Sequence, residues 1–149
     1  MNELQEFARK EFERIENNKE HIFRIMSNSI FLERTVIDLI KDRARLLNST
    51  KLLRYAEDED ISISDKLRLL RFTDTIDEGT YLTATTLISI RNKVAHLNFD
   101  KAYKEEQKLI KKLYSKPIKD EEHLLTIYEN MTEECTDELW RKFKVKRID

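Results

Sequence analysis

Glycine, proline and cysteine are almost missing from this chain, which contains one of each among its 149 residues. A single glycine leaves too few positions for tight hairpins or phosphate-cradling loops, so we exclude most all-β folds, the GxGxxG dinucleotide turn and the P-loop. A single cysteine excludes a disulfide framework and a cysteine-rich zinc site. No long apolar run and no apolar signal-peptide core is present, so we expect a soluble cytoplasmic domain that does not enter a membrane.

An excess of charge of one sign is also lacking, because 28 Lys and Arg residues nearly balance 29 Asp and Glu residues. The net charge of -1 gives no overall field that attracts nucleic acid, so any contact with RNA has to be local. One dense basic cluster lies in the tail and comprises Arg141, Lys142, Lys144, Lys146 and Arg147. We interpret this tail either as a solvated terminus or as a substrate-binding segment that uses Arg141, Lys142 and Lys144.

What the chain does have is helical periodicity, with 38% charged and 40% hydrophobic residues and apolar positions recurring every three or four residues. This pattern predicts an all-α fold with a single domain over residues 1–149. Short connections between such helices favour antiparallel neighbours, and therefore an up-and-down helical bundle. The expected helices cover 2–19, 28–47 (with 21–26 as an optional extension), 65–76, 81–97, 100–114 and 119–143. Residues 48–60 are expected to form a loop with at most one helical turn.

Several residues are expected on the apolar faces of these helices. Outside the helix over 81–97 they include Leu4, Phe12, Ile30, Leu47, Phe72 and Trp140. The acidic run at 57–60 lacks the spacing of a calcium loop, so we expect a solvated loop there.

The histidines outside the helix over 81–97 and the single cysteine carry no predicted chemistry. Cys135 is about 120° from His123 around a helix, which favours a structural or surface thiol over a catalytic Cys–His pair. His21 has no ligand-type partner three or four residues away, and we expect it at the surface or at a helix edge. We therefore predict neither a metal nor a cofactor.

The helix over 81–97 has an unusual distribution of charge. No charged residue occurs from Gly79 to Ile90, and Arg91 then falls within the apolar arc of a wheel with about 100° per residue. The arc comprises Ala84, Leu87, Ile88, Ile90, Val94, Ala95 and Leu97. Beside it runs a neutral strip of Thr85, Ser89, Asn92 and His96. Such a strip is typical of a cleft or a subunit interface, and also of a helix buried on two sides.

A carboxylate occupies the matching place on the helix over 28–47. Glu33 lies in the middle of an apolar stripe on that helix, as Arg91 does on its own helix. Each charge is costly to bury alone and tolerable when paired. We therefore predict an ion pair with about 4 Å or less between N and O. This ion pair either orients the Arg91 guanidinium toward a ligand or has the purely structural role of connecting two helices.

The string Ile-Arg-Asn-Lys-Val-Ala-His at 90–96 resembles the motif of the HEPN superfamily, in which an arginine and a following polar residue precede a histidine. Arg91, Asn92 and His96 match it, and the similarity, strongest to the mannitol-repressor-like branch, covers about residues 28–100. The resemblance implies a HEPN-like bundle with additional flanking helices that dimerises with its two motifs facing each other. Some members carry a tyrosine two residues after the histidine; here Asn98 replaces it, so modification at that position is not predicted.

The resemblance leads to two functional hypotheses. The first is a metal-independent endoribonuclease, a toxin or defence effector with a composite site at a dimer interface. In this hypothesis Arg91 binds the phosphate and His96 is the general acid or base. Asn92 orients the imidazole or binds the phosphate. Glu33 and Lys93 are supporting residues. The second is a non-catalytic regulator of the mannitol-repressor kind that binds another protein through the same surface. The expected partners are RNA, a second copy of the chain and an antitoxin or regulatory protein.

Overall fold

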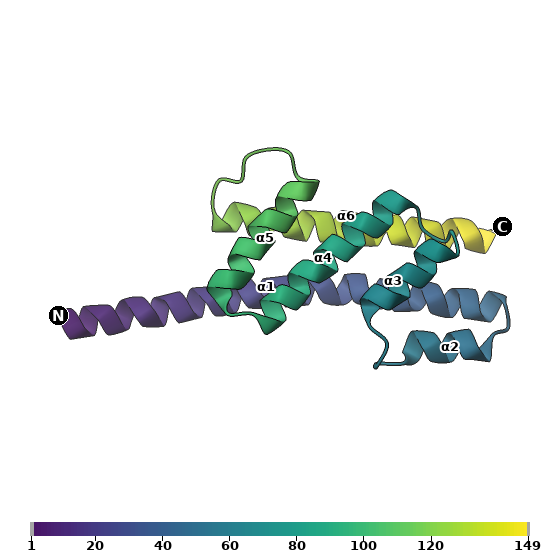
Figure 1. Cartoon of the computed structure of the whole chain (residues 1–149), viewed down its shortest axis with the longest axis horizontal. Coiled ribbons are helices and arrows are strands. Elements are labelled where there is room, and N and C mark those ends of the chain that lie inside the picture. Colours follow the sequence, from purple (N-terminus) through teal and green to yellow (C-terminus); the bar gives the residue numbers. More distant parts are fainter. Residues whose placement is uncertain (1, 149) are drawn as a thin grey trace.

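The structure, a computed structural model, describes residues 2–148 and contains six helices and no strand over that range (Figure 1). The helices are α1 (Glu3–Leu46), α2 (Thr50–Glu57), α3 (Ile63–Phe72), α4 (Glu78–His96), α5 (Phe99–Leu113) and α6 (Glu121–Ile148). The prediction of an all-α helical bundle is confirmed. None of the described helices is both long enough and apolar enough to span a bilayer.

The first helix is one continuous element of 44 residues, so the predicted interruption after residue 19, before a second helix beginning at 21 or 28, is wrong. Neither glycine nor proline occurs in that segment, and nothing else stops the helix there. Asn2 caps the start, since its side chain accepts from the Gln5 N–H while its own N–H donates to the Gln5 side chain. At about 1.5 Å per residue, α1 is roughly 66 Å long. Its N-terminal part projects beyond the other helices (Figure 1).

The segment 48–60, expected as a loop, contains the eight-residue helix α2. Asn48 turns the chain after α1 with a positive φ of 49°, which asparagine tolerates better than most residues. The Ser49 hydroxyl then accepts from the Leu52 N–H and caps the new helix. Ser62 caps α3 in the same way, since its hydroxyl accepts from the Asp65 N–H.

Two long helices form the frame of the bundle. Helices α1 and α6 lie side by side and run in the same direction, while α4 crosses both in the opposite direction (Figure 1). Helices α2 and α3 pack on the C-terminal half of α1, and α5 packs on α4 and α6. The core fills the space between them and includes Ile25, Leu32, Val36, Ile40, Leu67, Leu70, Leu87, Ile90, Ile110, Leu124 and Leu139.

Some apolar residues that were expected to be covered are exposed. Phe72 is 88% exposed because α3 ends there, four residues earlier than predicted. Ile30 and Leu47 are exposed on α1 and just after it, and Trp140 is partly exposed on α6. Leu4 lies on the projecting part of α1, which no other helix covers (Figure 1).

His21 shows the largest departure from its predicted environment, because it is 1% exposed rather than at the surface. Its Nε2 lies 2.7 Å from Glu106 Oε2, and its Nδ1 lies 3.0 Å from Glu121 Oε1. Phe99 and Tyr103 pack edge-on against the imidazole. His21 therefore joins α1 to α5 and to the start of α6.

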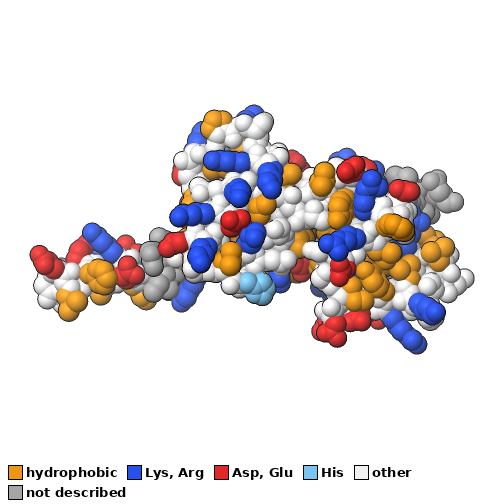
Figure 2. Space-filling model, in the orientation of Figure 1, with side chains coloured by type: hydrophobic (Ala, Val, Ile, Leu, Met, Phe, Trp, Pro, Cys, Tyr) orange, Lys and Arg blue, Asp and Glu red, His pale blue; other side chains and the backbone are white. Residues whose placement is uncertain are grey.

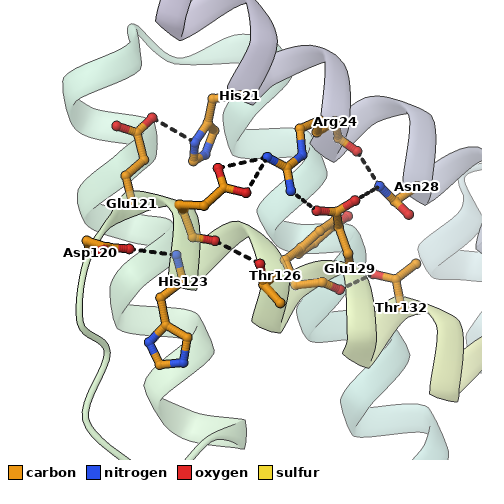
Figure 3. A network of polar contacts seen from close by, with 11 residues as sticks. His21, Arg24, Asn28, Asp120, Glu121, His123, Thr126, Glu129 and Thr132 are labelled. Carbon is orange, nitrogen blue, oxygen red and sulfur yellow. Dashed lines mark hydrogen bonds and ion pairs between the residues drawn. The ribbon is translucent and has the colours of Figure 1, made fainter.

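A second set of polar contacts continues along the same seam (Figure 3). Arg24 of α1 pairs with two carboxylates of α6, from Glu122 at 2.8 Å and from Glu129. Asn28, one turn further along α1, donates to the other oxygen of Glu129 at 3.2 Å. These contacts connect two helices that run in the same direction and share no loop.

Candidate functional site

Helix α4 places the motif residues, and its own sequence fixes where it begins and ends. The Asp77 carboxylate caps its start by accepting from the Thr80 N–H at 2.7 Å, and this contact lowers the pKa of Asp77 below its usual value. The predicted apolar arc is buried for five members, Ala84, Leu87, Ile88, Ile90 and Val94. Ala95 and Leu97 are exposed instead. For Leu97 the reason is that α4 ends at His96, so the wheel no longer applies to it.

The predicted ion pair between α1 and α4 is confirmed. Arg91 Nε lies 3.3 Å from Glu33 Oε1, and the two side chains are 28% and 21% exposed, so the pair is only partly buried. Among the described residues Arg91 Nε has no well-aligned hydrogen-bond acceptor, so the contact is electrostatic. On the other edge of the guanidinium, Arg91 Nη1 donates to Asn92 Oδ1 at 3.1 Å. Arg91 is thus held from two sides.

The three residues line an open cavity of about 610 Å³ between α1, α4, the end of α2, the start of α3 and the segment that joins these two helices. A volume of this size is in the range of small-molecule sites. Charges of both signs surround it. The lining cations are Arg34, Lys41, Lys66 and Arg91, and the lining carboxylates are Glu33, Asp38, Glu57 and Glu59. The acidic run at 57–60 therefore contributes to a cavity wall, which the sequence did not predict.

Lys66 is a cavity residue that sequence reasoning missed. Its side chain is buried, and its Nζ donates to the Asp58 carbonyl oxygen at 2.9 Å. A buried ammonium with a neutral acceptor adds positive potential to the wall near Arg91. In the sequence Lys66 resembles any solvated lysine on an amphipathic helix, so no local signal marked it.

His96 lies apart from Arg91 within one molecule. It is the last residue of α4, it is exposed, and its imidazole makes no hydrogen bond to any residue that the structure describes. Five residues along a helix correspond to about 140° of rotation, so Arg91 and His96 face different sides of α4. Asn92 is one turn before His96 and shares its side of the helix.

The remaining predicted site residues are not gathered at this cavity. Lys93 is partly exposed and forms no ion pair with another described residue. Lys142 Nζ lies 3.7 Å from Asp77 Oδ2, and Arg141 pairs with Glu138 at 3.3 Å. Asp77 caps the far end of α4, roughly 21 Å along the helix from Arg91. The side chain of Lys144 lies outside the described residues.

Cys135 and His123 form no catalytic pair. The thiol is buried, and this burial, with the nearby negative charge of Glu138, raises the pKa of Cys135 to about 12. It is therefore protonated at neutral pH and is not an active nucleophile. The His123 Nδ1 accepts from the Lys119 N–H at 3.0 Å. No group of His, Cys, Asp and Glu side chains within the described residues is arranged to hold a metal ion.

Comparisons with models of known families, with curated proteins and with solved structures give no match to the chain. The functional meaning of the site therefore depends on its residues and their geometry. The protein is an all-α bundle in which Arg91, at the edge of a cavity, is held between the Glu33 carboxylate and the Asn92 amide.

Proposed function

We propose that the chain is a metal-independent endoribonuclease of the HEPN type, acting as a toxin or defence effector. The observation that most supports this proposal is that two side chains fix the Arg91 guanidinium. Glu33 contacts its Nε, and Asn92 accepts a hydrogen bond from its Nη1. A guanidinium that is already oriented can bind phosphate oxygens with two parallel hydrogen bonds and little reorganisation. The adjoining cavity leaves room for a nucleotide beside it.

The proposed reaction is an attack of the ribose 2′-oxygen on the neighbouring phosphorus. A base removes the 2′-OH proton, the bond to the 5′-oxygen breaks, and an acid protonates that leaving oxygen. Histidine can perform either proton transfer near neutral pH, and His96 is exposed to solvent at the end of α4. The Arg91 guanidinium stabilises the negative charge that gathers on the phosphate. The products are a 2′,3′-cyclic phosphate and a 5′-hydroxyl.

The complete site in this proposal needs two molecules. Arg91 and His96 of one chain face different sides of α4, about 140° apart. A second copy that packs through the strip of Thr85, Ser89, Asn92 and His96 brings its own histidine toward the first motif. The strip suits such a contact because it is uncharged, and the Thr85 hydroxyl is already satisfied by the Tyr81 carbonyl oxygen at 2.9 Å.

We therefore expect a homodimer in solution with His96 near its twofold axis. Sedimentation velocity at micromolar concentration should give a dimer, and Ser89→Glu, which puts like charges opposite each other across the interface, should abolish this dimer. A monomeric wild-type chain would contradict the composite site.

The cleavage assay uses purified protein and total RNA in the presence of EDTA, which inhibits contaminating metal-dependent nucleases by chelating their metal ions. We expect fragments that end in 2′,3′-cyclic phosphate. Arg91→Lys should keep the charge and the contact with Glu33 but lose the planar fork, so it should fold like the wild type and cut poorly. Arg68→Lys, the same change at an exposed arginine of α3 outside the cavity, is the matched control and should retain activity.

Absence of cleavage by the wild-type chain would overturn the proposal. The second candidate, a regulator that binds a protein partner through the same strip, would then take its place.

A further inference from the structure

The two ends of α1 carry apolar surface that no part of the described chain covers. At the N-terminal end, Leu4 and Phe7 are 76% and 64% exposed on the projecting part of the helix. Near the C-terminal end, Leu46, Leu47 and Phe72 are exposed where α1, α2 and α3 meet. Figure 2 shows hydrophobic side chains on the projecting helix and a second group over the opposite end of the molecule. We call the first surface, residues 2–7, the tip, and the second, built on residues 43–54 with Phe72, the patch.

The patch contains a hollow of about 200 Å³. Its apolar lining comes from α1, α2 and α3, and includes Leu47, Leu52 and Leu69. An engineered cavity of about 150 Å³ is enough to bind benzene, so a hollow of this size accepts a phenylalanine ring. Arg43 is the one charged side chain in the described lining. The hollow is therefore shaped for an apolar side chain and has a cation at its edge.

The charges of the two ends are complementary. Residues 43–54 carry four cations, Arg43, Arg45, Lys51 and Arg54, and no carboxylate. None of the four is in an ion pair with another residue of the described chain. Residues 2–7 carry Glu3 and Glu6 and no cation; Glu6 is paired with Arg9 just beyond the tip, so Glu3 is the carboxylate that faces the patch cations in this proposal. Opposite fields of this kind steer surfaces together and fix their orientation at low ionic strength.

We infer that the tip of one molecule docks on the patch of a second copy, with Phe7 or Leu4 in the hollow and Glu3 near the patch cations. The projecting helix provides a reason to expect an occupant, since an isolated helical end gains little stability without packing. A second copy of the chain fits best as the occupant, because each chain carries one tip and one patch, and the charges of these two surfaces are opposite. The contact is heterologous: different surfaces meet, so it either closes into a ring or reciprocal pair, or propagates.

This contact is separate from the α4 strip and does not depend on the proposed function. It uses residues at both ends of α1, whereas the strip lies on α4. The test therefore compares variants with one another, so that any dimer formed through the strip is common to all of them.

The experiment measures association by sedimentation velocity at about 0.05 M and 0.5 M salt, where the Debye length falls several-fold. The tip variant is Leu4→Gln with Phe7→Gln, and the patch variant is Leu47→Gln with Phe72→Gln. Each should weaken association at least about tenfold, and high salt should weaken the wild type in the same direction. The matched control is Phe23→Gln with Phe31→Gln, which removes two equally exposed aromatic rings from the middle of α1 and should change nothing. All changed residues are exposed or partly exposed, so circular dichroism should show an unchanged helical fold.

The decisive step is to mix the tip variant with the patch variant. The tip variant keeps an intact patch and the patch variant keeps an intact tip, so the mixture should associate more strongly than either variant does alone. Recovery is expected only from a contact between unlike surfaces. No recovery, an effect of the control as large as that of the tip variant, or a wild type that behaves like the tip variant would each overturn the inference.

Discussion

Replacement of His21 by alanine is expected to lower the free energy of unfolding by about 3–5 kcal/mol, the range measured when one partner of a buried ion pair is removed. The reason is Glu106, which is fully buried and loses its one hydrogen-bond partner among the described residues. The same change also removes the ring against which Phe99 and Tyr103 pack. Urea denaturation followed by circular dichroism measures the loss directly.

Two further variants separate the buried charge from the lost volume. His21→Leu with Glu106→Leu removes both polar partners, and should cost clearly less than the single alanine change because no unpaired charge remains. His123→Ala is the control, since this partly exposed histidine accepts from the Lys119 N–H and packs edge-on against Tyr114 but contacts no buried charge among the described residues. If His21→Ala costs no more than His123→Ala, the role given to the buried cluster is wrong.

The same cluster should make stability depend on pH. Burial alone would lower the pKa of His21, but the hydrogen bonds and negative charges of Glu106 and Glu121 outweigh it and raise the pKa above the ordinary 6.5. A raised pKa in the folded state means that this stabilisation is complete below about 6.5 and is lost as the pH rises through the folded value. We expect the unfolding free energy to fall across that range in the wild type. In His21→Ala this part of the pH dependence should be absent.

The contrast between Arg91 and His21 shows what the sequence could and could not predict. The pair of Arg91 and Glu33 was predictable because each charge interrupts a local apolar stripe, and helical periodicity reports that interruption directly. The partners of His21 lie 85 and 100 positions away along the chain. No local pattern encodes such a distance, so a search at three and four residues had to place His21 at the surface.

Helix ends and cavities were harder to predict than helix faces, for a related reason. Periodicity indicates which side of a helix is apolar, but whether a neighbour covers it depends on where the other elements stop. Phe72 follows the apolar pattern of α3 and is exposed because that helix ends with it. The cavity at Arg91 is assembled from α1, α4, the end of α2, the start of α3 and the segment between them, so Lys66 of α3 became part of it only through tertiary packing.

His96→Ala is expected to reduce RNA cleavage by about 10²–10⁴-fold, the usual contribution of a general acid or base. Its melting temperature should stay within a few degrees of wild type, because the side chain is exposed and truncation leaves no buried cavity. Addition of free imidazole should restore part of the cleavage if the histidine transfers a proton. A fully active variant, or one that unfolds, would remove the catalytic assignment of His96.

A mixture of two inactive variants tests whether the histidine acts across the dimer. His96→Ala keeps Arg91, and Arg91→Lys keeps His96. If the two groups of one site come from different molecules, a heterodimer of these variants contains one intact site and one site with both changes. Random exchange makes half of the dimers heterodimers, so the mixture should recover about a quarter of the wild-type rate. Recovery is expected because about 140° of helix rotation separates Arg91 from His96 within a chain. No recovery would mean that one molecule supplies both groups, and that the dimer serves another purpose than completing the site.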